Sequence, residues 1–175
     1  MIPPSPLVAF YRGEQPDDRG RTLAAIQGWD DGRLEAVHDY IQWLFPLPER
    51  SAFNPGAPLL GPADIVAFQG SAELRGRLLA SLRRMLAFYG LALDEAGEAP
   101  LVVPAPDFGQ HARHWLRPGN HNLLRLTRIL RCLTLLGLPE HARALLACLE
   151  ELAGEVGPVT LRYWRDAVRR GPGQA

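Results

Sequence analysis

The spacing of apolar positions along the chain is typical of α-helices in every long segment. Apolar side chains recur every three or four residues, as they do on one face of a helix, over residues 71–89, 120–136, 139–155 and 158–170. Residues 101–103 resemble a short strand, but no second clear strand accompanies them. We therefore predict an all-α fold: a single compact domain of about eight helices, with proline-rich ordered loops.

Residues 31–45 form the most aromatic of the predicted helices, and Pro46 ends it. At 100° per residue, His38 lies inside the apolar stripe of this helix. Tyr40 and Trp43 point away from the stripe, so a second side of the helix is also aromatic. A helix that is apolar on two sides is expected to be largely buried.

Residues 121–136 form a second helix that the pattern predicts to be enclosed. Leucine and isoleucine cover most of its surface, and the narrow remaining stripe carries His121, Arg125, Arg128 and Cys132. Buried guanidinium groups need partners, because an unpaired buried charge is costly. Either the arginines pair with carboxylates such as Asp39, Asp30 or Asp31, or they bind an anionic ligand at the start of the helix, or they are simply exposed.

The balance of charge argues against nucleic acid or membrane lipid as a partner. The chain has 19 basic and 19 acidic side chains, for a formal net charge of zero. All of the basic residues are arginine, which is typical of a GC-rich, bacterial genome. The two cysteines fall within predicted helices, as expected of reduced thiols in a cytosol. Without a signal peptide or a long apolar run, we expect a soluble cytoplasmic protein with no transmembrane segment.

Common catalytic and metal-binding signatures are missing from the sequence, so we predict neither a metal nor a cofactor. His111 and His114 have the helical spacing of a metal-binding pair, but no third ligand with motif spacing accompanies them. His141 follows Pro139 near a helix start and is expected to be exposed. The aromatic and basic segment 161–170 is expected to be an amphipathic last helix with Trp164 inside.

Four segments in order resemble the conserved domain of the opioid growth factor receptor family. Residues 38–46 (HDYIQWLFP) closely resemble its VHxYIQWLFP signature, and residues 57–60 (APLL) resemble the segment that follows. Residues 85–91 (MLAFYGL) are similar to its MLxFYG segment, and residues 121–130 (HNLLRLTRIL) to its HNNLRITRIL helix, with Leu123 in place of an asparagine. Residues 10–12 (FYR) match its opening, so the resemblance covers about residues 7–170.

This resemblance implies one conserved domain over residues 1–175, with a core at about 7–170 and a frayed tail at 171–175. Eukaryotic members, nuclear or membrane-associated, are reported to bind the pentapeptide enkephalin, and they extend well beyond this domain. We expect this chain to be a domain-only member whose ligand is a small anionic molecule or a peptide.

Three functional hypotheses follow. The first is a binding module whose candidate ligand-binding residues are His38, Gln42, Trp43, His121, Asn122, Arg125 and Arg128. The second is an enzyme that uses His38 or His121 as acid or base, with arginines holding an anion. The third is a structural or protein-interaction domain in which these residues only stabilise the core. No catalytic residue is assigned.

Overall fold

The computed structural model describes residues 3–169 and 171 of the chain. Over this part it has ten α-helices, one short 3-10 helix and one two-stranded sheet, which confirms the mostly helical fold class. The chain divides into two compact units, Met1–Ser81 and Leu82–Ala175. The single domain over residues 1–175 stays a prediction.

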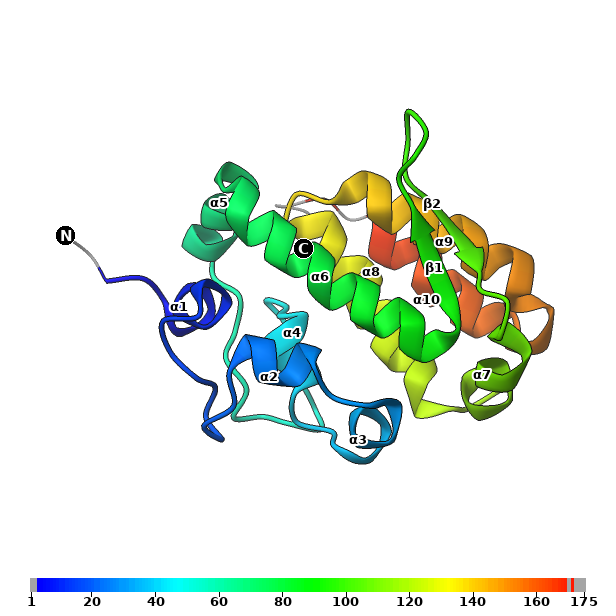
Figure 1. Cartoon of the computed structure of the whole chain (residues 1–175), viewed down its shortest axis with the longest axis horizontal. Helices are drawn as coiled ribbons and strands as arrows, with labels where there is room; N and C mark the ends of the chain where they lie inside the picture. The colour runs from blue at the N-terminus through cyan, green and yellow to red at the C-terminus, as the bar shows by residue number, and fades with distance from the viewer. Residues whose placement is uncertain (1–2, 170, 172–175) are drawn as a thin grey trace. The chain divides into compact units, whose positions relative to one another are not determined.

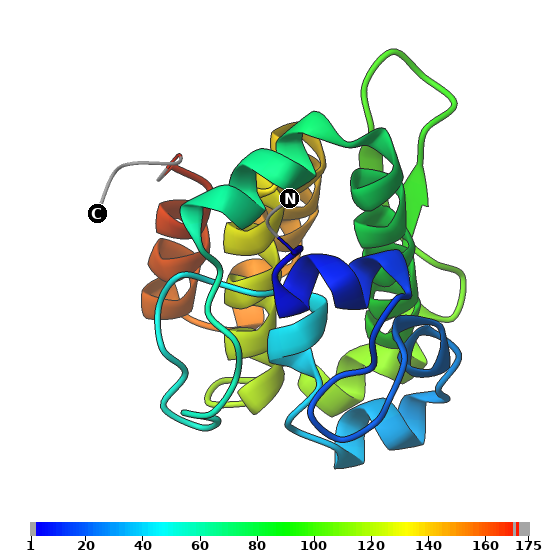
Figure 2. The same ribbon diagram turned by 90° about the vertical axis from the view of Figure 1, so that its left-hand side faces the viewer.

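The first unit consists of short helices and the beginning of a long one (Figure 1). Its helices are Pro6–Arg12 (α1), Leu23–Gln27 (α2), Asp31–Ala36 (α3), Ile41–Leu44 (α4), Pro62–Gly70 (α5) and the first part of Ala72–Tyr89 (α6). Helix α1 packs against α5 (Figure 2), where the Ser5 hydroxyl donates to the Asp64 carboxylate. The core of this unit is aromatic: the rings of Tyr11 and Phe68 meet edge-on at 5.1 Å between centroids.

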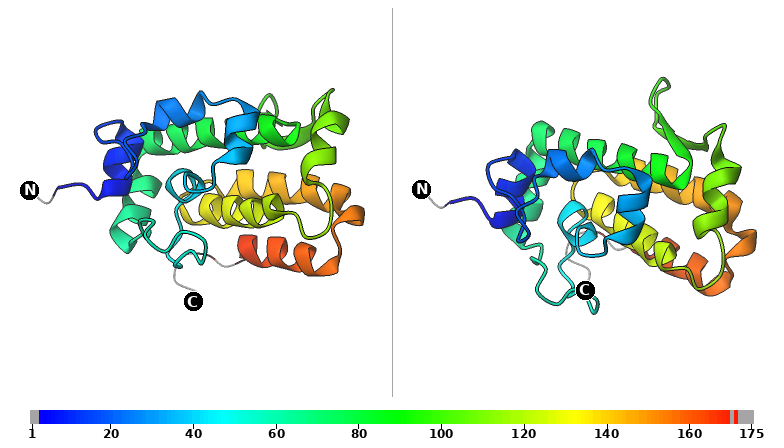
Figure 3. Two further views of the ribbon diagram at one scale, coloured as in Figure 1. Left: turned by 90° about the horizontal axis from the view of Figure 1, so that it is seen from below. Right: turned by 60° about the horizontal axis from the view of Figure 1, so that its bottom comes forward.

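The second unit is a helical layer with one hairpin. After the end of α6 come Leu91–Asp94 (β1), Leu101–Pro104 (β2), Phe108–Trp115 (α7), His121–Leu135 (α8), Pro139–Leu152 (α9), the 3-10 helix Ala153–Glu155 and Pro158–Arg169 (α10). Helices α8, α9 and α10 lie side by side (Figure 3), and β2 packs against α9. Trp115 and Trp164 are fully buried here, and the Trp115 indole N–H donates to the Tyr89 carbonyl at 3.1 Å.

The prediction of one helix over residues 31–45 is wrong, because the segment breaks into α3 and α4. Val37 is extended, with φ −96° and ψ 134°. The Tyr40 hydroxyl donates to the Leu34 carbonyl at 2.9 Å, where a continuous helix would use the N–H of residue 38. His38 therefore lies in the break and is exposed, instead of lying in an apolar stripe.

The predicted strand 101–103 has a partner that the pattern did not reveal. Strand β1 pairs with it antiparallel, with Leu91 opposite Pro104 and Asp94 opposite Leu101. The sequence of β1, Leu-Ala-Leu-Asp, is poor in the β-branched and aromatic residues that favour strands. Its pairing with β2 decides its conformation.

The remaining helices agree with the predicted ranges to within a few residues. Gly90 ends α6 with φ +74°, and Asn120 caps α8 by accepting from the Asn122 N–H. The predicted enclosure of α8 is only partly correct, since Leu124 is 57% exposed and His121 is exposed as well. Residue 170, predicted to end the last helix, and residues 172–175 of the predicted frayed tail lie outside the described residues.

Candidate functional site

Helix α4 carries two of the predicted site residues, Gln42 and Trp43, and both are buried. The Trp43 indole N–H donates to the Asp18 carboxylate at 3.1 Å, and its ring packs 5.2 Å from that of Phe10. The Gln42 Nε2 atom lies 3.5 Å from Ser51 Oγ, and Oε1 has no hydrogen-bond partner among the described residues. Trp43 thus stabilises the core of the first unit, whereas the Gln42 carboxamide is weakly bonded.

His38 lies beside an ion network that fixes the break between α3 and α4. Asp39 accepts from Arg21 Nη1 at 2.7 Å and lies 3.3 Å from Arg19 Nε. Arg21 also pairs with the buried Asp17 at 2.6 Å. The hydrogen bond from Arg21 lowers the pKa of Asp39 below its ordinary value, despite partial desolvation of the carboxylate. Asp39, considered above as a partner for the arginines of α8, is thus bound within its own unit.

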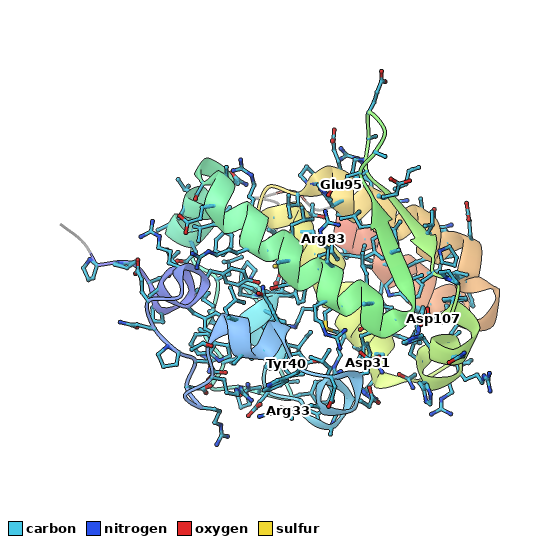
Figure 4. The ribbon with its side chains drawn as sticks, viewed as in Figure 1. Asp31, Arg33, Tyr40, Arg83, Glu95 and Asp107 are labelled. Carbon is cyan, nitrogen blue, oxygen red and sulfur yellow. The ribbon has the colours of Figure 1, made fainter. Side chains whose placement is uncertain are left out.

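Trp29 is an arginine-binding aromatic residue that the sequence patterns did not single out. The guanidinium group of Arg33 lies 4.2 Å from the Trp29 ring centroid, and that of Arg21 lies 5.6 Å from it. The Tyr40 ring meets Trp29 edge-on at 5.4 Å, and Figure 4 labels Arg33 and Tyr40. Trp29 could have been identified in the sequence by its position directly before Asp30, the N-cap of α3. A large apolar residue at that position commonly packs over the first helical turn.

The first turns of α8 bring together four predicted site residues of the second unit. Asn122 is fully buried, and Arg125 is only 6% exposed although it carries a charge. Arg125 Nη1 donates to Asn122 Oδ1 at 3.3 Å. His121 is exposed one turn before Arg125, and Arg128 is half-buried one turn after it. The structure thus arranges one imidazole and two guanidinium groups along the start of a 15-residue helix.

Helix α10 holds the opposite side of this helix start in place. The Trp164 indole N–H donates to the Leu123 carbonyl at 3.2 Å, and Trp164 is fully buried as predicted. Arg165 on the outer side of α10 pairs with Glu150 of α9 at 2.6 Å. The first turn of α8 is therefore tied to α10 through the Leu123 carbonyl.

The histidine pair of α7 does not form a metal-binding group. Both ring nitrogens of His111 are engaged: Nε2 lies 3.0 Å from the Asp107 carboxylate and Nδ1 lies 2.9 Å from the Phe88 carbonyl. His114 is exposed. Across the described residues there is no group of three metal-ligating side chains. His111 instead anchors α7 to the end of α6.

Glu95 joins three elements of the second unit, and the expected exposure of His141 is incorrect. His141 of α9 is half-buried, with Nε2 3.0 Å from Glu95 Oε1, and Arg83 of α6 pairs with the other Glu95 oxygen. Figure 4 labels Arg83 and Glu95, which follows β1. The hydrogen bond from His141 lowers the pKa of Glu95, and the charge of Arg83 adds to this.

Both cysteines are free and buried. Burial raises the pKa of the Cys132 thiol far above its ordinary value and that of Cys148 to about 11. Neither thiol is therefore ionised near neutral pH, so neither is a ready nucleophile. Among the helices of residues 3–169, none is long and apolar enough to cross a bilayer.

Comparison with known proteins places these helices in one family. Residues 9–169 match the opioid growth factor receptor (OGFr) conserved region. The opioid growth factor receptor of Rattus norvegicus is 42% identical over 143 residues, which is 78% of this chain and 24% of the relative. That of Homo sapiens is 38% identical over 144 residues, covering 80% of this chain and 21% of the relative.

A second group of relatives carries the same region. Opioid growth factor receptor-like protein 1 of Rattus norvegicus is 39% identical over 133 residues, covering 73% of this chain and 28% of the relative. The chain therefore spans about a quarter of the length of these relatives. No solved structure matches it. The match over residues 9–169 confirms the resemblance seen in the sequence, and the chain belongs to the opioid growth factor receptor family.

Proposed function

We propose that this domain is a binding module that recognises a peptide, or a small molecule, through an anionic group. Its relatives are named as receptors for a growth factor, and this chain corresponds to their conserved region. A recognition function for that region is therefore the simplest inference.

The buried Arg125 is the observation that carries the proposal. A guanidinium group has five N–H donors in a planar fork that matches a carboxylate or phosphate, and burial strengthens such a contact. Arg125 is 6% exposed, and its Nη1 donates to the Asn122 oxygen, which holds the guanidinium group beside the start of α8. With His121 and Arg128 on the same stripe and the helix N-terminus beside them, the start of α8 favours negative charge.

An enzymatic function has less support. The two histidines that an enzyme of this kind would use, His38 and His121, are both exposed. General acid–base catalysis benefits from a group that is partly shielded from water beside its substrate. A purely structural role for the α8 arginines remains the competing explanation, and the experiment below separates it from ligand binding.

Calorimetric titration with enkephalin and with its C-terminally amidated form tests the proposal. We expect the free carboxylate form to bind and the amidated form to bind at least tenfold more weakly. Arg125→Ala and the Arg125→Ala, Arg128→Ala double variant should weaken binding by a similar factor, whereas Arg143→Ala, which removes an exposed arginine of α9, should leave it unchanged.

Two outcomes would contradict this function. One is equal affinity of both peptide forms. The other is a lack of binding by enkephalin together with a lack of binding by a panel of carboxylated and phosphorylated small molecules. Circular dichroism of each variant ensures that a loss of affinity does not reflect unfolding.

We also propose a cytoplasmic location and a bacterial origin. The two free cysteines support a reducing compartment, and the exclusive use of arginine supports a GC-rich genome. Fractionation of cells that express the native gene tests the location. Recovery from a membrane or secreted fraction would contradict it.

A further inference from the structure

His111 of α7 faces two hydrogen-bond acceptors at once. Its Nδ1 atom lies 2.9 Å from the Phe88 carbonyl oxygen, and its Nε2 atom lies 3.0 Å from a carboxylate oxygen of Asp107. A carbonyl oxygen and a carboxylate oxygen accept hydrogen bonds and do not donate them. Both contacts are therefore hydrogen bonds only when both nitrogens of the ring carry a proton.

The protonated ring fits this position better than the neutral ring. A neutral imidazole has one N–H, so it satisfies one acceptor and turns a lone pair toward the other. A proton on Asp107 would also supply the second hydrogen bond, but a carboxylic acid is ordinarily more acidic than an imidazolium ion by about 2.5 pH units. Since the Asp107 side chain is 56% exposed to water, the proton belongs to His111.

The surroundings of the ring also favour its positive charge. The last turn of α6 presents carbonyl groups, the negative end of the helix dipole, and it has no basic side chain. The titratable side chain of that turn is Tyr89, and a phenol is ordinarily neutral below about pH 10. On α7, Arg113 and His114 are exposed, so water and salt screen their charges. Asp107 is the carboxylate that faces the ring.

His111 is packed tightly where α7 lies beside the end of α6 (Figure 1), and Figure 4 labels Asp107 just before α7. A Cβ atom on Gly90 would lie 2.8 Å from the Cβ atom of His111, so the side chain lies against the backbone that ends α6. We propose that His111 is a pH-sensitive lock: its protonated ring ties the first turns of α7 to the last turn of α6, and loss of that proton loosens them.

The lock acts on a helix that supports the start of α8. Asn120, which caps α8, donates from Nδ2 to the His114 carbonyl at 3.0 Å. At the far end of α7, the Trp115 indole N–H donates to the Tyr89 carbonyl, and this bond needs no added proton. Loss of the His111 proton should therefore loosen α7 without releasing it from α6. The inference does not depend on the ligand proposed for α8, and its test uses no ligand.

The test is NMR of the whole chain from about pH 5.5 to about pH 9, which follows the histidine ring signals and the exchange of backbone amides with solvent. We expect the His111 ring to keep its second proton to a higher pH than histidine does in the urea-unfolded chain. Over the same titration, the protection factors of the amides of residues 110–112 should fall about tenfold. Those of the Trp115 indole N–H and of the α9 amides should not change.

Asp107→Asn should remove the pH dependence, because an amide N–H can donate to the unprotonated Nε2 atom of a neutral ring. The Asp107 side chain makes no capping hydrogen bond to α7, so this variant should fold as the original chain does. We expect the protection of residues 110–112 to stay constant with pH in this variant. His114→Gln is the matched control: it removes an exposed histidine of the same helix and should retain the full tenfold fall.

Three outcomes would overturn the proposal. One is a His111 ring that loses its proton at the same pH in the folded and the urea-unfolded chain. Another is a fall in α7 protection that persists in Asp107→Asn. The third is a fall that the α9 amides share, because it would mean that the whole second unit unfolds.

Discussion

The hydroxyl group of Tyr40 donates a hydrogen bond of 2.9 Å to the backbone carbonyl of Leu34, six residues earlier in the chain. In a continuous helix that carbonyl would accept from the N–H of residue 38. The substitution of a side-chain donor for a backbone donor allows the chain to leave the helix between Ala36 and Ile41. Asp39 is thereby placed where Arg21 binds it.

Tyr40→Phe should lower the free energy of unfolding by about 0.5–1.5 kcal/mol, because it removes one buried hydrogen bond while keeping the buried ring. Urea denaturation followed by circular dichroism measures the change. Tyr163→Phe is the matched control: Tyr163 is 55% exposed, and loss of its hydroxyl should change stability by less than about 0.5 kcal/mol. Equal effects of the two substitutions would contradict the role assigned to Tyr40.

Replacing a glycine by alanine should change stability in opposite directions at Gly90, which ends α6, and at Gly76, which lies inside α6. Gly90 has φ +74°, and a Cβ atom there would lie 2.8 Å from the Cβ of His111, so Gly90→Ala should cost more than about 1 kcal/mol. Gly76 is an exposed residue inside α6 where an added Cβ meets nothing within 4 Å. Gly76→Ala should stabilise the chain by about 0.5–1 kcal/mol. Thermal unfolding of both variants checks the signs.

The ion pair of Asp39 predicts a loss of stability in acid. Its pKa is lowered in the folded chain, so the pair contributes stability at pH values above the ordinary pKa of aspartate. That contribution disappears as the pH falls through the lowered value. Asp39→Asn should therefore reduce stability at neutral pH, and the difference from the unchanged chain should vanish in strong acid. The control is Glu98→Gln at an exposed position in the hairpin loop, which should change stability at neutral pH by less than about 0.5 kcal/mol.

The contact between His141 and Glu95 should be visible in the titration of Glu95. The hydrogen bond from His141 is the largest cause of the lowered Glu95 pKa. His141→Ala should therefore raise this pKa toward the ordinary value of glutamate, as measured by NMR of the carboxyl carbon. Arg83→Ala should raise it as well, but by less. An unchanged Glu95 pKa in the histidine variant would show that the contact does not persist in solution.

The long helices were predictable because their apolar spacing and their caps agree. Residues 120–136 and the observed α8 differ by one residue at each end, and both Asn120 and Gly90 serve the capping roles that their types favour. The family was also predictable from the sequence, because the four motifs occur in the order typical of the family, and the match over residues 9–169 confirms it.

The break at residues 37–40 was not predictable from periodicity. It depends on Arg21, which lies 18 residues before Asp39, and on a side-chain hydroxyl that replaces a backbone donor. Periodicity describes neighbours along a helix and carries no information about such distant partners. For the same reason the patterns identified His38 and Gln42 together but did not reveal that one is exposed and the other buried.

The four tryptophans allow the unfolding of this chain to be followed by intrinsic fluorescence. Trp29 and Trp43 lie in the first unit and Trp115 and Trp164 in the second, and each is at most 8% exposed. Emission from one pair, with the other pair replaced by phenylalanine, therefore reports the unfolding of a single unit. Coincident transitions would mean that the chain folds as one cooperative domain, and separate transitions that each unit is a folding domain in its own right.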